Sequence, residues 1–323
     1  MKKITIILLI CIMIPCMVFA GGSGAKSGEK FPSQTIKLIV PWSAGGGTDA
    51  IARALAQTGE KHLGVPVVVE NKPGGNGAVG LSEVVTAKPD GYTLAILPVE
   101  LGFLKDQGIY PFDFNNFSRF MNLNSDPAAL TVKADAHWNT LQEFINYAKA
   151  NPEKISIAHS GTGLLWHLAG LALANATGAK FTFVPFNGAG DAMAAIIGNN
   201  VNAMTFSGAE VSAQVKAGSL KVLAVFNDKR VDFLPNVPTA KEQGANIVLS
   251  TFRGLGGPAG IPADRVKILH DGFKAMMEEQ VFKGIMGNMG LGIDYRNPQD
   301  YEKLTNDTTK LLAPLVKLAI ENQ

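Results

Sequence analysis

The chain has 323 residues, of which 46% are hydrophobic and 17% are charged, and it contains 35 glycines. This length suits about two domains, and the charged fraction is below the roughly 25% of an average globular chain. The formal net charge is only +2, from 29 Lys and Arg against 27 Asp and Glu. A nucleic-acid binder needs a larger basic excess or a basic stripe, so we expect no nucleic-acid partner.

The first twenty residues have the layout of a secretory signal peptide. Lys2 and Lys3 precede an uncharged apolar run that ends at Val18-Phe19-Ala20, with small residues at the two positions that signal peptidase reads. The alternative, a retained membrane anchor, is less favoured because the run is short for a membrane span and no charge cluster follows it. We therefore expect cleavage after Ala20 and a periplasmic location.

Both cysteines, Cys11 and Cys16, lie inside this segment. The residues before them, Ile10 and Pro15, are not the small residue that lipidation requires. The mature chain would contain no cysteine, which excludes disulfides, a thiolate nucleophile and cysteine-ligated metals. Loss of the two lysines in the segment leaves 29 − 2 = 27 basic residues against 27 acidic ones, a formal net charge of zero.

After a flexible leader at residues 21–30, one unit recurs along the chain: a short β-branched strand, a Gly/Ser/Thr-rich turn and an amphipathic helix. The first helix begins at Asp49, and the second runs through Leu81 and Val85. The strands predicted in this part of the chain cover 36–42, 65–70 and 92–97.

The same unit returns in the middle of the chain, with predicted helices that end near Gly178 and Gly218. The strands predicted there cover 155–158, 181–186, 201–206 and 220–226. Alternating strands and helices favour parallel sheets covered on both faces, and the number of units suits two sheets better than one. We predict an α/β fold of two lobes, each a mostly parallel sheet flanked by helices.

The lobe boundaries follow from the order of these units. One lobe is predicted to comprise residues 31–122 plus 228–323, and the other residues 123–227. The chain would cross between the lobes near Asn122–Asp126 and again near Phe226–Arg230. The last predicted helix, Pro298–Glu321, is compatible with packing on either lobe.

The glycine-rich turns predict an anion site. Each turn lies at the carboxyl end of a predicted strand, where open parallel sheets bind their ligands. Each turn also opens a helix, whose first turn has N–H groups without a helical acceptor and the positive end of the helix dipole. Such turns hold anions without a basic side chain, and their Ser and Thr hydroxyls add donors. A small carboxylate is the predicted ligand.

Other sites built on glycine-rich turns are less favoured. Gly75–Gly80 fits G-x-G-x-x-G between a strand and a helix, but Glu100, the nearest suitable acid, is a few positions too far along, and export removes the nicotinamide pool. No glycine turn continues as G-K-[ST], and the mature chain has no G-x-S-x-G elbow. We therefore expect no cofactor and no catalytic residue.

The chain has five histidines, and none is paired at H-x-x-x-H spacing, so we predict no metal site. His159 is interpreted as a buried, satisfied histidine and His167 as a structural residue that holds its turn, although His159 could instead face the ligand. Asp49 has two roles open to it, helix cap or ligand contact. Trp42 and Trp166 flank two of the turns, either as core residues or as walls of a pocket.

With these turns in place, the chain resembles the substrate-binding proteins of tripartite tricarboxylate transporters, the Bug family. The resemblance covers nearly all of the mature chain, and six matching segments in the same order make it specific although each is weak alone. The segments are Pro41–Asp49 with Ala52-Arg53, Asn71–Gly80, Gly161–Gly163 with His167-Leu168, Val184–Gly188, Arg230 with Leu234–Thr239 and Glu242–Gly244, and Gly257–Pro262.

The resemblance implies a two-lobed periplasmic-binding-protein fold, a Venus flytrap, that closes on a small organic acid. Proteins of this family hold one carboxylate between the lobes with backbone amides, hydroxyls and ordered waters. The ligand would pass to the permease subunits of a tripartite transporter, and the binding protein would be a monomer. The resemblance and the turns together predict these ligand-binding residues: Trp42, Ser43, Ala44, Gly46, Gly47, Thr48, Asp49, Gly75, Asn76, Gly77, Ser160, Gly161, Thr162, Gly163, Leu164, Phe186, Asn187, Gly188, Thr205 and Ser207.

Three residues depart from the family pattern. Ala44 replaces a usual proline, Leu164 a common hydroxyl residue and Phe186 a common tyrosine. The last two changes remove polar groups, so we hypothesise a ligand with an apolar part or a single carboxylate rather than a citrate-like polyacid. Two other functions are kept as alternatives, a sensory subunit that presents its ligand to a receptor kinase and, less favoured, an exported enzyme acting on a carboxylate.

Overall fold

The structure, a computed structural model, describes residues 30–186 and 188–321. The predicted signal peptide and nearly all of the predicted leader therefore lie outside the described residues, as does Asn187. The compact unit considered below begins at Pro32.

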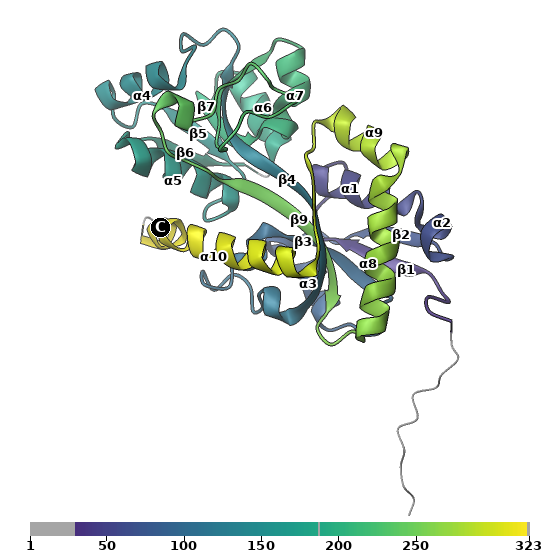
Figure 1. The fold of residues 1–323 in the computed structure, drawn as a ribbon. Helices are drawn as coiled ribbons and strands as arrows, with labels where there is room; N and C mark the ends of the chain where they lie inside the picture. Colours follow the sequence, from purple (N-terminus) through teal and green to yellow (C-terminus); the bar gives the residue numbers. More distant parts are fainter. Residues whose placement is uncertain (1–29, 187, 322–323) are drawn as a thin grey trace, which may run out of the picture. The chain divides into compact units, whose positions relative to one another are not determined.

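One mixed sheet of ten strands organises this unit (Figure 1). The strand order is β2-β1-β3-β9-β4-β7-β5-β6, with β8 and β10 paired to β4 outside this path. The strands are β1 (Ile36–Val40), β2 (Val67–Asn71), β3 (Thr93–Pro98), β4 (Phe117–Lys133), β5 (Ser156–His159), β6 (Thr182–Pro185), β7 (Ala203–Ser207), β8 (Leu220–Val225), β9 (Ser250–Pro258) and β10 (Ile293–Arg296).

The pairing is parallel toward both ends of the sheet and antiparallel in its middle. Strand β1 pairs in parallel with β2 and β3, and β5 does so with β6 and β7. Strand β9 runs antiparallel to β3 and β4, and β4 runs antiparallel to β7, β8 and β10. The parallel parts are the predicted strand–turn–helix units. The antiparallel middle was not predicted, because it joins strands that are far apart in the sequence.

Strand β4 connects the two parallel parts. Over Phe117–Pro127 it pairs with β9, and over Ala128–Lys133 it pairs with β7 and β8. Most of its side chains are buried, including the polar residues Asn122, Asn124 and Asp126. Buried polar side chains need hydrogen-bond partners. The partners of Asn124 and Asp126 lie close to the predicted ligand turns.

The helices flank the two parallel parts (Figure 1). Toward β1–β3 lie α1 (Gly47–Ala56), α2 (Gly59–Leu63), α3 (Ala78–Val85), α8 (Ala263–Glu278) and α9 (Gln280–Met289). Toward β5–β7 lie α4 (Leu141–Ala150), α5 (Leu165–Thr177), α6 (Ala189–Ile197) and α7 (Gly208–Lys216). Short 3-10 turns occur at η1 (Gly75–Gly77), η2 (Val99–Gly102), η3 (Phe114–Asn116) and η4 (Lys241–Gln243).

The last helix, α10 (Pro298–Glu321), has the predicted bounds. It contacts β4, β10 and η2 and also α5, so it touches both groups of elements. Near its start Tyr301 is fully buried against Gly254 of β9, where an added Cβ would lie 2.1 Å from the tyrosine ring. Among the described helices, none has both the length and the hydropathy of a membrane span.

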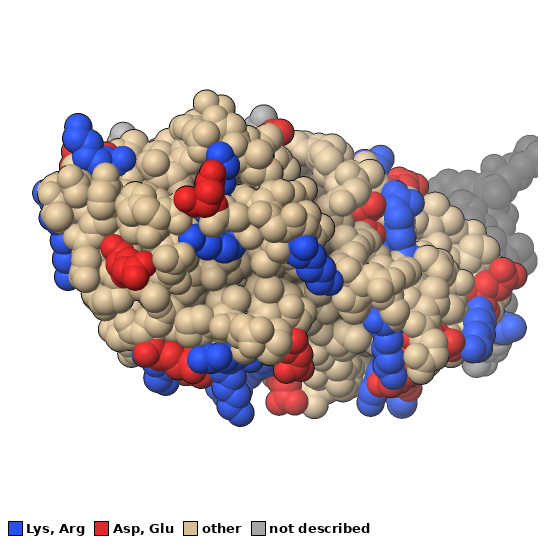
Figure 2. Space-filling view, turned by 90° about the horizontal axis from the view of Figure 1, so that it is seen from above, with Lys and Arg blue, Asp and Glu red and all other residues tan. Residues whose placement is uncertain are grey.

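Charged side chains are mixed on the face that Figure 2 shows. Lys and Arg side chains lie among Asp and Glu side chains, and the areas between them are uncharged. This face therefore presents no extended area of a single sign.

Candidate ligand-binding site

The predicted turns follow strands that are neighbours in the sheet. The turn after β1 lies beside the turn after β2, because the two strands pair in parallel. The turn after β5 lies beside the turn after β6 for the same reason. The carboxyl ends of parallel strands meet at one edge of a sheet, which is where such folds bind ligands. The structure thus forms two pairs of glycine-rich turns.

The turn between β1 and α1 presents exposed backbone. Ser43, Ala44, Gly45 and Gly46 are exposed and Trp42 is half-buried, while the side chains of the first helical turn are buried at Thr48 and Asp49. Gly46 is the N-cap of α1, with extended backbone and no capping side chain. The N–H groups of the first turn have no acceptor within the helix and remain available to an anion.

The carboxylate of Asp49 stabilises this turn from within. It accepts hydrogen bonds from Gly45 N at 2.9 Å, from Arg53 Nε at 3.0 Å and from Asn71 Nδ2 at 2.9 Å. Burial raises the pKa of Asp49, but the hydrogen bonds from Arg53, Gly45 and Asn71 together lower it by more. The net pKa therefore lies below the usual value. Of the two predicted roles, these bonds support a role within the turn over contact with a ligand.

The turn after β2 depends on its glycines. Asn76 and Gly77 have φ of +56° and +96°, in the left-handed region. A Cβ on Gly77 would lie 3.1 Å from the hydroxyl oxygen of Tyr110. That hydroxyl donates a short hydrogen bond to the carbonyl of Asn76. Tyr110, a residue that the sequence did not single out, therefore fixes this turn.

Two imidazoles hold the turn between β5 and α5. Gly161 N donates to His159 Nδ1 at 3.2 Å, and Gly163 N donates to His167 Nδ1 at 3.1 Å. The rings stack with their centroids 4.5 Å apart. Burial lowers the pKa of each ring to about 4, and for His159 the neighbouring His167 adds to the effect. Both rings are therefore neutral acceptors at neutral pH, which confirms the structural interpretation of His167 and the buried state of His159.

The remaining residues of this turn differ in exposure. Ser160 and Gly161 are half-buried, Thr162 is exposed and Gly163 is buried. Leu164, the N-cap of α5, is buried, and its side chain packs back over Gly161. Gly163 also accepts a hydrogen bond, from Gln107 Nε2 to its carbonyl at 2.9 Å.

The last predicted contacts lie on and beside β6 and β7. Phe186 and Gly188 are half-buried and flank Asn187, which lies outside the described residues. Thr205 and Ser207 are fully buried. The hydroxyl of Thr205 donates to the carbonyl of Trp166 at 2.7 Å, and Ser207 Oγ shares a capping box with Glu210. Both hydroxyls therefore already have partners within the chain.

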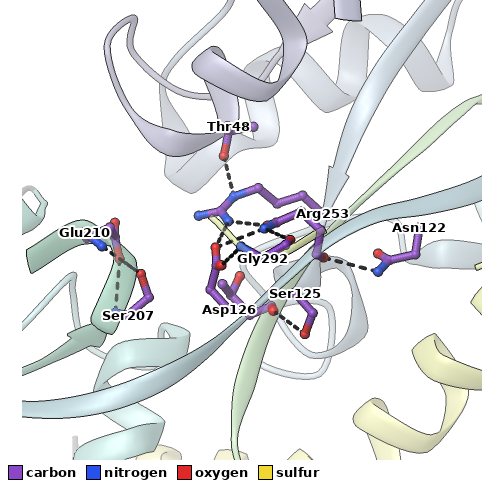
Figure 3. A network of polar contacts seen from close by, with 10 residues as sticks. Thr48, Asn122, Ser125, Asp126, Ser207, Glu210, Arg253 and Gly292 are labelled. Atoms are coloured by element: carbon purple, nitrogen blue, oxygen red, sulfur yellow. Dashed lines mark hydrogen bonds and ion pairs between the residues drawn. The ribbon is translucent and has the colours of Figure 1, made fainter. Parts of the chain in front are cut away.

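A buried arginine that sequence reasoning missed lies under the turn after β1 (Figure 3). Arg253 of β9 donates from Nε to Thr48 Oγ1 at 3.0 Å, and from Nη1 to Asn124 Oδ1 at 2.6 Å and Asp126 Oδ2 at 2.8 Å. The other carboxylate oxygen of Asp126 accepts from Gly292 N at 2.8 Å. The network joins α1, β4, β9 and the segment before β10. No local pattern shows it, because Thr48 and Arg253 are 205 residues apart.

Two further acids lie near Arg253. Glu210, in the first turn of α7, is half-buried, and so is Glu100 in η2, just beyond the β3 residue Pro98 that pairs with Arg253. Burial raises the pKa of Glu100 to about 7, while the positive charge of Arg253 opposes the rise and Glu210 adds to it. Burial also raises the pKa of Glu210, again opposed by Arg253.

Neither a metal cluster among the described residues nor the cavity beside α10 coincides with the turns. In the part of the chain that the structure describes, no group of three or more His, Cys, Asp or Glu could hold a metal ion. A cavity of about 300 Å³ is lined by residues of η2, η3 and α10 and by residues of the segment that connects η2 to η3. Its lining includes Lys105, Asp113 and Lys310. Its lining includes none of the predicted ligand residues.

Comparison with known proteins gives a consistent family. The sequence profile described as tripartite tricarboxylate transporter family receptor, TctC, matches residues 51–319. A Cupriavidus necator protein, "UPF0065 protein in gbd 5'region", is 34% identical over 283 residues, which are 87% of this chain and 86% of that protein. The crystal structure of a TctC solute-binding protein from Polaromonas is 36% identical, with a TM-score of 0.76, over 89% of this chain and 99% of that chain.

The structure of the periplasmic binding protein BugD is also similar, at 29% identity and a TM-score of 0.79, over 90% of this chain and 98% of that chain. The matched profile covers well over half of the chain, and the Cupriavidus relative exceeds 30% identity over most of both proteins. The predicted two-lobed periplasmic-binding-protein fold is confirmed by these neighbours. The chain belongs to the tripartite tricarboxylate transporter receptor family, which includes the Bug proteins, and it is a solute-binding protein rather than an enzyme.

Proposed function

We propose that this protein captures a small organic carboxylate between two lobes and delivers it to a tripartite tricarboxylate-type membrane transporter. The observation that carries the proposal is the turn between β1 and α1. Gly45 and Gly46 are exposed, the helix has no capping side chain, and Asp49 is bonded within the turn. A carboxylate is the group that such first-turn N–H donors favour.

The second lobe would contribute contacts from the turns after β5 and β6. There the imidazoles already engage Gly161 N and Gly163 N, which leaves Ser160, Thr162 and the backbone around Gly188 as donors. Phe186, which is half-buried, would supply apolar surface, whereas Leu164 is buried and packs back over Gly161. In the first lobe, the proposed ligand contacts are Ser43–Asp49 and Gly75–Gly77.

The lobes would be joined by β4 and β9. The first crossing is proposed in β4 at Asn122–Asp126, as the sequence predicted. For the return, residues after β8 stay bonded to the second lobe, since Ala240 N donates to Val225 O and Leu249 N to Phe226 O. We therefore propose the return near Ser250, at the start of β9, in place of the sequence estimate at residues 226–230. Closure would bend these two strands.

Export and delivery complete the proposal. Proteins of this family are periplasmic, and we propose export with cleavage after Ala20 and a monomeric mature chain. The proposed partner is the permease of a tripartite transporter. Deletion of the gene should abolish uptake of the bound acid while binding by the purified protein persists. If uptake is unchanged and the neighbouring genes encode a receptor kinase instead of a permease, the sensory role replaces delivery.

Binding itself is tested with the mature protein, residues 21–323, in a thermal-shift screen of mono-, di- and tricarboxylates. A ligand that binds only the folded state raises the melting temperature by mass action, and isothermal titration then gives affinity and stoichiometry. Malate and adipate belong in the panel because two solved Rhodopseudomonas palustris proteins with this fold contain them, at 24% and 23% identity. Carboxylate capture is contradicted if amides and amines of the same size bind as tightly as the acids.

A further inference from the structure

Arg253 has one guanidinium nitrogen left for a ligand. Nε and Nη1 are bonded to Thr48, Asn124 and Asp126, whereas Nη2 has no hydrogen-bond acceptor among the described residues. The residue is only 7% exposed. Nη2 lies 3.4 Å from the position a Cβ would take on Gly47, the first residue of α1. A charged donor and the free N–H groups of a helix N-terminus thus meet at one point.

One carboxylate is bonded to this guanidinium, and two further acids interact with its charge. Asp126 is its buried ion-pair partner at 2.8 Å. Glu210 lies across from it with Ser207, on the side to which the guanidinium extends in Figure 3. Glu100 feels the charges of both Arg253 and Glu210, and its carboxyl has no hydrogen-bond donor among the described residues apart from its own backbone N–H. The positive charge of Arg253 therefore acts on three acids, of which only Asp126 is in contact with it.

This imbalance disfavours a second carboxylate on the ligand. One carboxylate can bind Nη2 and the first turn of α1, where a charge-assisted bond is strong. A second carboxylate near Glu100 and Glu210 would meet like charge, which disfavours binding. A hydrogen-bond donor there would instead find two acceptors.

From this geometry we infer that the ligand is a small monocarboxylate with an ammonium or hydroxyl donor at its far end. The carboxylate binds Arg253 Nη2 and the first turn of α1, and Glu100 and Glu210 accept from the donor. The inference rests on the proposed function and narrows it to this ligand class.

The test compares four probes of equal chain length: 5-aminovalerate, 5-hydroxyvalerate, valerate and glutarate. Isothermal titration at pH 8 keeps Glu100 ionised, because its pKa is about 7. We expect 5-aminovalerate to bind at least about tenfold more tightly than valerate, the gain of one charged hydrogen bond. Hydroxyvalerate should fall between them, and glutarate should bind more weakly than valerate.

Two mild variants test the contacts at the two ends of the ligand separately. Gly47→Ala places a methyl group against Nη2 at a position without positive φ, so the helix is retained. It should weaken all four probes by about tenfold, since the carboxylate loses its contact. Glu100→Gln should reduce, without abolishing, the advantage of 5-aminovalerate over valerate, because Glu210 remains as an acceptor, and it should improve glutarate relative to valerate.

The matched controls are Gly284→Ala, whose Cβ meets open space on α9, and Glu60→Gln, an exposed acid of α2. Both should bind like the unaltered protein, and circular dichroism checks the fold of every variant. The inference is overturned if glutarate binds as tightly as 5-aminovalerate, or if Glu100→Gln leaves the ratio of the affinities for 5-aminovalerate and valerate unchanged. If none of the probes binds and no acid of the wider panel does, the proposed function itself fails.

Discussion

The turn between β1 and α1 and the turn between β5 and α5 look alike in the sequence, since each places Gly, Ser and Thr between a strand and a helix. In the structure they differ. The first is held from below by charged groups, Asp49 and Arg253, and its exposed glycines leave the helix N-terminus open. The second has two amides bonded to neutral imidazoles and a buried leucine as its N-cap.

The difference shows that glycine-rich turns are not equivalent anion sites. A free helix N-terminus with a charged donor beside it can hold a carboxylate, whereas a turn whose amides already have acceptors mainly shapes the pocket. We therefore assign the anchoring of the ligand to the first turn and its enclosure to the second. The predictions below test this assignment, from the largest expected effect to the smallest.

Removal of Arg253 should have the largest effect on the first turn. Arg253→Met leaves Asp126 fully buried without its cation, a change that costs about 3–5 kcal/mol of unfolding free energy. Urea denaturation measures the loss. The double variant Arg253→Met with Asp126→Leu should recover much of it while carboxylate binding stays weak. Recovery of binding as well would show that Arg253 acts on the fold alone.

Acid should destabilise the second turn specifically. His159 and His167 have pKa values of about 4 when folded, below the unfolded value of about 6.5. The unfolded state therefore binds more protons, so the stability is complete above pH 6.5 and is lost as the pH falls toward 4. By pH 5 the loss should be on the order of 2 kcal/mol for each ring.

The variant His167→Asn tests this assignment, because asparagine offers an acceptor near the position of Nδ1 but does not titrate. Its unfolding free energy should fall less steeply between pH 7 and pH 5 than that of the unaltered protein. His137→Asn, at an exposed histidine, is the control and should leave the slope unchanged. An unchanged slope in His167→Asn would contradict a neutral buried ring.

Loss of the charge at Asp49 should loosen the first turn. Asp49→Asn keeps the size but weakens the bonds from Gly45 and Arg53, which should lower the unfolding free energy by about 1 kcal/mol. The exposed pair Asp271–Lys267 supplies the control. Asp271→Asn should cost less than about 0.5 kcal/mol. Equal effects of the two variants would mean that Asp49 has no special role in the turn.

The smallest effect is expected at Gln107, which bonds to the second turn from the segment after η2. Gln107→Ala should change the unfolding free energy by about 0.5–1 kcal/mol and the affinity for the ligand by a few-fold, because it loosens the turn without touching the anchor. Titration calorimetry compares it with Gln142→Ala on α4, whose partner Asn146 is exposed. A loss of binding as large as that of Arg253→Met would contradict the assignment.

Local patterns sufficed to predict the strand–turn–helix units. β-branched runs and helical periodicity appear in the sequence around β1, β2, β5 and β6, and the bounds of α10 agree with the prediction. The structural role of His167 could also be predicted, because its acceptor atom serves a turn only four residues away.

Long-range pairing could not be predicted in this way. Strand β4 contains Asn122, Asn124 and Asp126, and β9 contains Arg253 between small and apolar residues, so neither has the pattern of a buried strand. The burial of these polar residues is explained only by the hydrogen bonds that they make with each other. Asp126 and Arg253, for example, are 127 residues apart in the sequence. The sequence therefore suggested an anion site made of backbone alone, and the structure adds a buried guanidinium beneath it.

The central claim is that the ligand carboxylate is anchored at the turn between β1 and α1. A crystal structure of the mature protein with 5-aminovalerate tests it most directly. We predict a carboxylate oxygen within hydrogen-bond distance of Arg253 Nη2 and of the first-turn N–H groups of α1, with the amine toward Glu100 and Glu210. A carboxylate bound instead at Ser160–Leu164, without contact to α1 or Arg253, would contradict the account.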